Sequence, residues 1–315
     1  MNTICSIVVD KASKNFKDIR AINNLSFSVG NGEIFGLIGP DGAGKTTLIR
    51  CIAGLLLLDA GVITVEGIDV LKNPDQVKSI AGYMSQRFSL YTDLSVMENI
   101  RFFGDLYGIP RKKQLEMIPG LLHFARLEEF KYKRAEYLSG GMRQKLALAC
   151  TMINEPAVLL LDEPTTGVDP VSRLELWQIF QKIRSQGKTI LISTPYMDEA
   201  ERCDNVGFIY SGEMKIIGTP DQIKSLVEGF VFEAIVSKSK NALELLRRSS
   251  LFKDVQVFGE RLHIISDEDI SESRVKETLN KIGVEVAAVR RTRPTVEDVF
   301  MQIMQETLPK TPEDI

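Results

Sequence analysis

A glycine-rich loop between a strand-like run and a helical pattern is the segment of this chain best suited to bind phosphate. It follows the apolar run 34–38, and its glycines let successive backbone N–H groups turn inward around phosphate oxygens. Lys45 would reach the β- and γ-phosphates of a nucleotide, and the Thr46 hydroxyl would be a ligand of Mg²⁺. A chance glycine turn is the alternative, and the strand-and-helix context disfavours it. The loop consists of Gly39, Pro40, Asp41, Gly42, Ala43, Gly44, Lys45, Thr46 and Thr47.

An acidic pair, Asp162 and Glu163, is the second group suited to chemistry. It ends the apolar run 158–161, as expected for a buried parallel strand whose C-terminal end enters a site. Asp162 would hold the Mg²⁺ shell through water, and Glu163 would polarise an attacking water. The alternative is a solvated acidic turn before Pro164.

Two further features are weaker evidence for a binding site when each is taken alone. The loop Ser139 to Gly141 precedes a helical stripe and is a candidate second anion site, although a glycine-capped core helix fits equally well. Phe16 lies before the phosphate loop, where an exposed aromatic ring could stack on adenine. An ordinary packing phenylalanine is the alternative for that residue.

Alternating strands and helices must position these loops. Thr92, Asp93 and Ser95 look like capping residues for a helix carrying Val96, Ile100, Phe103 and Leu106, and Pro119 should shorten or kink the next helix, 112–122. After a connector, strands and helices follow in β-α-β-β-α-β order, which is the split βαβ pattern, and Thr295 should cap a terminal helix. The expected strands are 4–9, 24–29, 34–38, 62–66, 158–162, 190–193, 206–210, 214–217, 230–236, 255–258, 261–265 and 284–289, and the expected helices of the last part include 242–248 and 273–282.

Composition bounds the possible functions. A chain of 315 residues predicts about two domains, and a net charge of −3 gives no electrostatic case for nucleic acid as a partner. The four cysteines show no metal-ligand spacing, and no apolar run approaches the roughly 18 residues that span a bilayer. We see no signal peptide, so we expect a cytoplasmic protein that reaches a membrane only through a partner. The expected divisions are 1–225, with a helical subdomain at about 88–150, then 226–308 and a disordered tail, 309–315.

Taken in order, these pieces resemble the ATP-binding subunit of ABC transporters over residues 4–225. The glycine loop matches the Walker A motif, residues 159–164 match Walker B, and residues 138–144 match the signature that other phosphate-loop ATPases lack. The resemblance implies an α/β fold, a P-loop NTPase core of ABC type with a mainly parallel sheet, a small antiparallel β subdomain and a helical subdomain, followed by the small α+β domain. The phrase around Thr295 resembles the C-terminal extension of drug-exporter-type members.

The resemblance also implies roles for individual residues. Catalysis would fall to Glu163, Gln86 and Lys45, with Phe16 on adenine, and Mg²⁺ would be held by Thr46, Gln86 and Asp162. The family forms head-to-tail dimers in which each nucleotide lies between one subunit's Walker A loop and the other's signature. The residues expected to contact the partner's nucleotide are Leu138, Ser139, Gly140, Gly141, Met142 and Gln144, and Asp169 is expected to be the D-loop aspartate.

One position departs from the family pattern. The family places a switch histidine after the strand that ends in Ser-Thr, and Pro195 stands there in this chain. Proline has no side-chain donor or acceptor, and losing a positioned polar catalytic group commonly lowers a rate about 10²- to 10⁴-fold. We expect ATP binding to survive and hydrolysis to be slow. The phrases around Gly39 and Pro195 look most similar to the first half of YbhF-type tandem ATPases, which favours a heterodimer with an intact second ATPase over a homodimer.

The expected function is therefore an ATPase subunit of an ABC exporter, with ATP and Mg²⁺ as its ligands. It would lie on the inner face of the membrane through a separate permease, and Phe88, Leu90 and Tyr91 are candidates for that contact. A soluble ABC ATPase without a permease is one alternative, and an ATP-binding regulatory subunit with little hydrolysis is another. The sequence does not name the exported compound; drug-like molecules are implied only by the resemblance.

Overall fold

The computed structural model describes residues 5–87, 90–236, 246, 252–258 and 261–307. The chain divides into two units, Met1–Thr219 and Pro220–Ile315. The expected boundary lies after residue 225, so helix α8 (Pro220–Lys224) belongs to the second unit instead of the first. Phe88, the tail 309–315 and the expected helix 242–248, apart from Leu246, lie outside the described residues.

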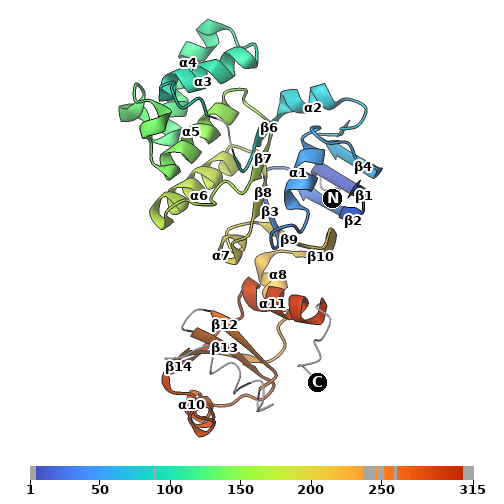
Figure 1. Ribbon diagram of the computed structural model, residues 1–315, viewed down its shortest axis with the longest axis vertical. Helices are drawn as coiled ribbons and strands as arrows, with labels where there is room; N and C mark the ends of the chain where they lie inside the picture. The colour runs from blue at the N-terminus through green and yellow to red at the C-terminus, as the bar shows by residue number, and fades with distance from the viewer. Residues whose placement is uncertain (1–4, 88–89, 237–245, 247–251, 259–260, 308–315) are drawn as a thin grey trace. The chain divides into compact units, whose positions relative to one another are not determined.

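A mainly parallel sheet forms the centre of the first unit (Figure 1). Its strand order is β10-β9-β3-β8-β7-β6, and only the β9–β10 pair is antiparallel. Every residue of β3, β7 and β8 is buried, which explains their continuous apolar runs. Because parallel strands end at one edge, β3, β7 and β8 bring the glycine loop, the acidic pair and Pro195 to the same side. The strands are β3 Ile34–Ile38, β6 Ala81–Met84, β7 Val158–Asp162, β8 Thr189–Thr194, β9 Asn205–Tyr210 and β10 Glu213–Gly218.

A second sheet of the first unit is antiparallel, in the order β2-β1-β4-β5. Its first two strands are about twice as long as expected from the sequence. Register shifts interrupt their pairing between Val9 and Ala12, where Lys11 has a φ of 50°, so the apolar alternation is lost in the second half. Phe16 is therefore the last residue of a strand and pairs with Ile19. The strands are β1 Cys5–Phe16, β2 Ile19–Gly30, β4 Ala60–Val65 and β5 Ile68–Asp69.

Helices α3, α4 and α5 lie together beside the central sheet, on the opposite side from the antiparallel strands (Figure 1). The expected cap of α3 is confirmed, because the Ser95 and Glu98 side chains bond each other's backbone N–H groups. Helix α4 continues through Pro119 and ends three residues beyond the expected end, so the predicted shortening is wrong. Leu106 is exposed, so it does not belong to the buried stripe. The helices are α3 Val96–Leu106, α4 Arg111–Ala125 and α5 Gly140–Met152, with short 3₁₀ turns at Glu128–Phe130 and Ala135–Tyr137.

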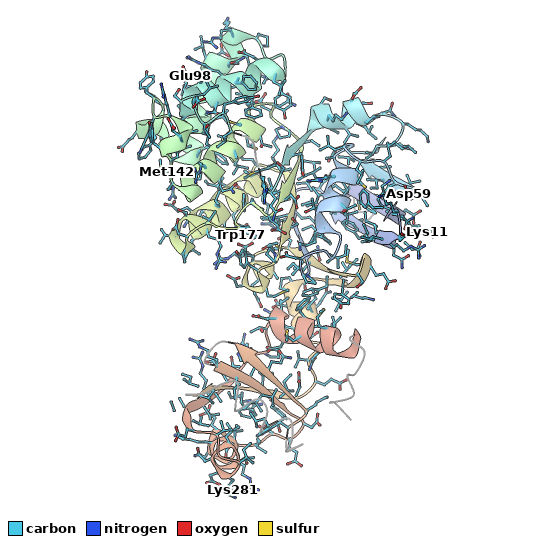
Figure 2. All side chains as sticks on the ribbon, in the orientation of Figure 1. Lys11, Asp59, Glu98, Met142, Trp177 and Lys281 are labelled. Carbon is cyan, nitrogen blue, oxygen red and sulfur yellow. The ribbon has the colours of Figure 1, made fainter. Side chains whose placement is uncertain are left out.

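Among its described residues, the first unit has four further α-helices. Helix α6 buries Trp177 (Figure 2). The Trp177 ring packs edge-on against Phe180, with 5.6 Å between ring centroids. Asp169 caps this helix, since its carboxylate accepts the backbone N–H of Ser172 at 2.9 Å. The helices are α1 Lys45–Ile52, α2 Pro74–Ile80, α6 Pro170–Ser185 and α7 Met197–Ala200.

The described part of the second unit contains a four-stranded antiparallel sheet in the order β12-β13-β11-β14. One face carries an apolar core that includes Phe232, Leu262 and Ile264, and α10 packs there through Val275 and Leu279. Thr295 caps α11 as expected, because its hydroxyl accepts the N–H of Asp298 at 3.2 Å. The elements are β11 Phe230–Val236, β12 Asp254–Phe258, β13 Arg261–Ser266, α10 Glu272–Lys281, β14 Val286–Thr292 and α11 Val296–Thr307. Within the described part of the chain, no helix is long and apolar enough to cross a membrane.

Candidate active site

The glycine loop connects β3 to α1 and is packed tightly against its neighbours. A Cβ atom at Gly39 would lie 2.1 Å from the carbonyl oxygen of Ile209, and one at Gly44 would lie 2.3 Å from that of Ala21. Gly44 also has a φ of 108°, in the left-handed region that favours glycine. These two glycines are therefore required by the fold of the loop, and they place the N-terminus of α1 at the loop.

Lys45 is almost fully buried at the start of α1. Its Nζ atom donates to the carbonyl oxygens of Gly39 at 2.7 Å and Pro40 at 3.0 Å, and lies 3.7 Å from Oε1 of Glu163. Burial lowers the pKa of Lys45, although the charges of Glu163 and Asp41 oppose the shift. The glycine loop thus holds a cation beside the acidic residue that follows β7.

Asp162 is fully buried at the end of β7. Its Oδ1 atom accepts hydrogen bonds from the hydroxyls of Thr46 at 2.9 Å and Ser193 at 2.8 Å. Its Oδ2 atom is buried and has no hydrogen-bond partner among the described residues. A buried carboxylate oxygen left without a donor beside a threonine hydroxyl fits a hard divalent cation such as Mg²⁺.

Glu163 has a strained backbone, with a φ of 50°. Its N–H group donates to Oγ of Ser193 at 3.1 Å, and its Oε2 atom accepts from Nε2 of Gln86 at 2.8 Å and from the Thr166 hydroxyl at 3.2 Å. These contacts fix both the backbone and the carboxylate of Glu163. The Glu163 carboxylate is thus held in one orientation, with its Oε1 atom beside Nζ of Lys45.

Ser193 is a residue that the sequence did not single out. It is fully buried on β8 and bonds both acidic residues, Asp162 through its proton and the Glu163 backbone through its oxygen. The only sequence signal is a hydroxyl at the end of an otherwise apolar run, 190–193. The Ser193 hydroxyl reaches the acidic pair because β7 and β8 are neighbouring strands, which the sequence alone does not show.

The signature loop begins helix α5 as expected, and the Ser139 hydroxyl accepts the N–H of Met142 at 3.3 Å. A Cβ atom at Gly141 would lie 2.3 Å from the side chain of Ser172, whereas one at Gly140 would lie 3.6 Å from the oxygen of Gly167. Gly141 is thus required by contact with the start of α6. No hydrogen bond among the described residues joins Ser139 to the glycine loop of the same chain; its bonds are to Met142 and Arg143. Leu138 is buried, and Gln144 lines a cavity with Gln86 and Gly167.

Phe16 is the last residue of β1, and Pro195 directly follows β8. The Phe16 ring is 45% exposed, and Nζ of Lys14 lies 5.7 Å from its centroid. Pro195 is half-buried directly after β8, and the next residue, Tyr196, donates its backbone N–H to the Thr194 hydroxyl at 3.0 Å. Tyr196 also lies against Arg173, whose guanidinium carbon is 5.0 Å from the ring centroid.

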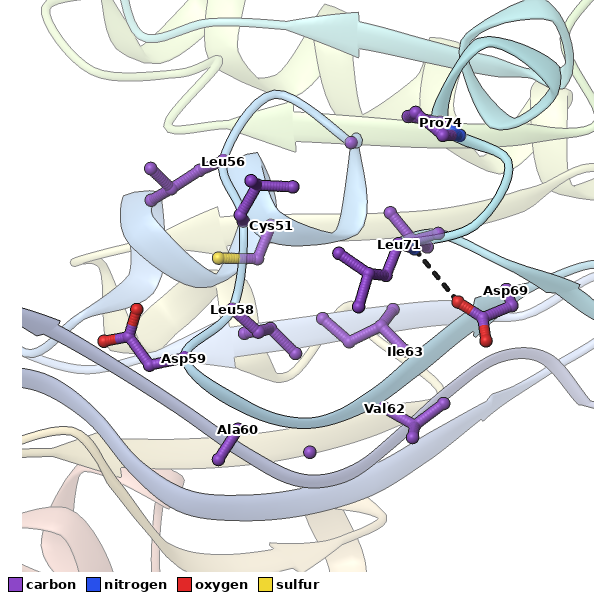
Figure 3. Close-up of a pocket in the computed structure, with 14 residues that line it drawn as sticks. Cys51, Leu56, Leu58, Asp59, Ala60, Val62, Ile63, Asp69, Leu71 and Pro74 are labelled. Atoms are coloured by element: carbon purple, nitrogen blue, oxygen red, sulfur yellow. Dashed lines mark hydrogen bonds between the residues drawn. The ribbon is translucent and has the colours of Figure 1, made fainter.

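A separate small cavity of about 110 Å³ lies between the end of α1, α2 and strands β4 and β5 (Figure 3). Leu58, Ile63 and Leu71 are among the apolar side chains that line it. Asp69 bonds the backbone N–H of Leu71 at 3.0 Å, and Asp59 pairs with Lys14. The walls are apolar, so this cavity does not suit a phosphate group.

The glycine loop, Lys45 and the acidic pair have the arrangement of a phosphate-binding loop, and comparisons with known proteins identify the family. Residues 22–166 match the family model described as ABC transporter. The probable multidrug ABC transporter ATP-binding protein YbhF of Escherichia coli K12 is 39% identical over 91% of this chain and 50% of its own length. The Nod factor export ATP-binding protein I of Rhizobium sp. N33 is 36% identical over 96% of this chain and 99% of its own. This chain thus spans about half the length of YbhF.

A solved structure of an ATP-binding subunit of an ABC transporter aligns with a TM-score of 0.63 and 30% identity, over 70% of this chain and 92% of the other. The chain therefore belongs to the ABC transporter ATP-binding proteins, and its named relatives are of the drug-exporter type.

Proposed function

We propose that this chain is the ATP-hydrolysing subunit of an ABC exporter. The observation that carries the proposal is the convergence of Lys45, Asp162 and Glu163 at one edge of the sheet. Nζ of Lys45 lies 3.7 Å from Glu163, and Thr46, the next residue, donates to Asp162 at 2.9 Å. A cation, a hydroxyl and two carboxylates around a glycine loop are the parts that phosphoryl transfer from ATP requires.

In the proposed reaction, the loop N–H groups and Lys45 bind the ATP phosphates, and Phe16 stacks on the adenine. Thr46, Asp162 and the amide oxygen of Gln86 would hold Mg²⁺, which neutralises charge on the β- and γ-phosphates when bound. Glu163 orients the attacking water and takes its proton. Gln86 and Thr166 keep the Glu163 carboxylate in place for that step.

The site is proposed to be completed by a second ATPase subunit. The signature residues Ser139 to Gly141 begin α5, next to Asp169 and Ser172, and would bind the nucleotide held by a partner's glycine loop. ATP would thus join two subunits, and hydrolysis would release them. The partner is either a second copy or, as the Pro195 position favours, a different and intact ATPase.

Pro195 supports a second candidate function, that of an ATP-binding regulatory subunit with little hydrolysis. The Pro195 side chain brings no donor or acceptor to the site, and Tyr196 lies against Arg173. Single-turnover hydrolysis by the chain alone and with a partner ATPase separates the two functions. Hydrolysis that depends on Glu163 of this chain supports the enzyme, and hydrolysis only at the partner's Walker motifs supports the regulatory subunit.

A membrane permease is the proposed partner for transport. Tyr91 is 47% exposed and packs against Phe102 of α3, with 4.3 Å between ring centroids, and the preceding Leu90 lines a cavity with Gln86. An intracellular helix of a permease would dock there and hold the chain on the inner face of the membrane. The relatives named for multidrug and Nod factor export support export, and we leave the compound open.

Co-expression tests the transport role directly. The chain should fractionate with membranes only when its permease is co-expressed, and a Tyr91→Asp variant should stay in the soluble fraction. A Tyr132→Asp variant, at another exposed tyrosine of the first unit, is the matched control and should remain with the membrane. Full solubility of the parent beside the permease would contradict the proposal.

A further inference from the structure

Helix α6 holds the segment that follows Pro195 along one of its faces. The side chains of Arg173, Trp177, Gln181 and Arg184 recur at the spacing of one helix face. Gln181 donates to the carbonyl oxygen of Arg202, Arg184 pairs with Asp204, and Arg202 lies over the ring of Trp177. Arg173 is the residue of this face nearest to Asp169, which caps the helix.

Arg173 has three contacts with the segment after Pro195. Its Nη2 atom donates to Asp198 at 3.0 Å, its Nε atom lies 3.9 Å from Oε1 of Glu199, and its guanidinium lies over the Tyr196 ring. Its backbone N–H donates to the carbonyl oxygen of Asp169 at 2.9 Å. The Arg173 side chain therefore joins the first turn of α6, which Asp169 caps, to the segment that begins at Pro195.

The contact between Arg173 and Glu199 differs from a surface ion pair because Glu199 is buried. The side chain is fully buried, and its Oε2 atom accepts the hydroxyl proton of Thr165, two residues beyond Glu163, at 3.1 Å. Its Oε1 atom is buried without a hydrogen bond among the described residues, and Arg173 is the cation beside it. A buried carboxyl group needs such a partner, so Glu199 links Arg173 to the chain that carries Glu163.

We propose that Arg173 is a positioning residue for ATP hydrolysis. Acting through Glu199 and Tyr196, it makes the Asp169 loop and the segment 194–199 move as one unit around Glu163. Because Pro195 supplies no polar side chain, contacts from α6 set where this segment lies. The inference rests on the proposed ATPase function, since it concerns the same site.

The test separates positioning from stability by comparing Arg173→Gln with the double variant Arg173→Gln/Glu199→Gln. The single variant leaves the buried Glu199 without a cation, so its Tm should fall. The double variant removes that charge, and its Tm should return to within a few degrees of the parent. If Arg173 positions the site, kcat of the double variant stays about 10- to 100-fold below the parent while KM for ATP changes less than about twofold.

Arg184→Gln is the matched control, because it removes an ion pair from the same helix face further from Glu163, and it should hydrolyse ATP at the parent rate. A double variant with the parent's kcat would overturn the inference while leaving the ATPase function intact. The parent chain should hydrolyse ATP, and Lys45→Ala should abolish that hydrolysis. If the parent does not hydrolyse ATP, or if Lys45→Ala hydrolyses it equally well, the proposed function fails, and the inference fails with it.

Discussion

The hydroxyl of Ser193 donates a 2.8 Å hydrogen bond to Oδ1 of Asp162 and accepts one of 3.1 Å from the backbone N–H of Glu163. One buried side chain on β8 therefore fixes both acidic residues at the end of β7. Glu163 has a φ of 50°, a conformation that persists only when its surroundings enforce it. Ser193 is part of that enforcement.

Replacing Ser193 with alanine should loosen the positions of both acidic residues of the site. The change removes the donor to Asp162 and leaves the Glu163 N–H with only the more distant carbonyl oxygen of residue 193 at 3.2 Å. We expect a loss of about 1 to 3 kcal/mol in the free energy of unfolding and a weaker dependence of ATPase rate on Mg²⁺. Urea unfolding and Mg²⁺ titration measure the two effects. Ser185→Ala, on the exposed end of α6, is the control, and parent-like values for Ser193→Ala would refute the role.

Replacing Pro195 with histidine should raise the rate of ATP hydrolysis. The backbone N–H of the following Tyr196 bonds Thr194, so this change need not disturb the local hydrogen bond. A histidine there would supply the polar group that the family uses, and we expect an increase of about tenfold or more in kcat. The ATPase assay on the purified chain checks this. An unchanged rate would show that Pro195 does not limit hydrolysis.

Gly141→Ala should destabilise the first unit, whereas Gly140→Ala should not. The new Cβ at position 141 would meet the Ser172 side chain at 2.3 Å, and the one at position 140 would meet only ordinary contacts. We expect Gly141→Ala to lower the free energy of unfolding by about 1 to 3 kcal/mol. Adding Ser172→Gly should recover most of this loss in urea unfolding. Equal stability of the two alanine variants would mean that the close contact is absent.

The second unit should lose stability as the pH rises from 6.5 through the raised pKa of His263. Burial lowers the pKa of His263, but its hydrogen bond to Asp298 at 2.7 Å and the nearby Glu233 outweigh burial and raise it above 6.5. The folded state therefore holds a proton that the unfolded state has lost. This contribution is fully present below pH 6.5 and disappears as the pH passes the raised value.

Urea unfolding of the full chain at a series of pH values measures that contribution, with hydrogen exchange of the backbone amides of α11 as the signal. His263→Gln should remove the pH dependence. His123→Gln should not, because the other histidine of the chain is exposed. A pH dependence that survives in His263→Gln would have to come from another group.

The sequence predicted the parts of the fold whose patterns are local. The Ser95 cap, the Thr295 cap and the buried strand before Asp162 each depend on neighbouring residues, and all three are present. The second half of β1 was missed, because register shifts break the apolar alternation that identifies a strand. Pro119 was expected to shorten or kink the helix that contains it, because it was judged by propensity alone. Helix α4 nevertheless continues to Ala125, and its packing in the helical region outweighs the propensity of Pro119.

In the candidate site, too, the motifs formed by neighbouring residues were predicted, and the contacts between distant segments were not. The glycine loop and the acidic pair were recognised as separate motifs, but 116 residues separate Thr46 from Asp162, and only the sheet brings them together. Ser193 and Arg173 make their contacts with segments distant in the chain, so their residue types alone did not identify them as parts of the site. Their roles became visible from strand order and from the helix face that they share with other contacts.

Single-turnover hydrolysis of Mg-ATP by the full chain tests the central claim most directly. Lys45→Ala should lose ATP binding, and Glu163→Gln should keep ATP binding but hydrolyse it at least about 100-fold more slowly than the parent. Hydrolysis by Glu163→Gln at the parent rate would contradict the assignment of this site as the one where the chain hydrolyses ATP.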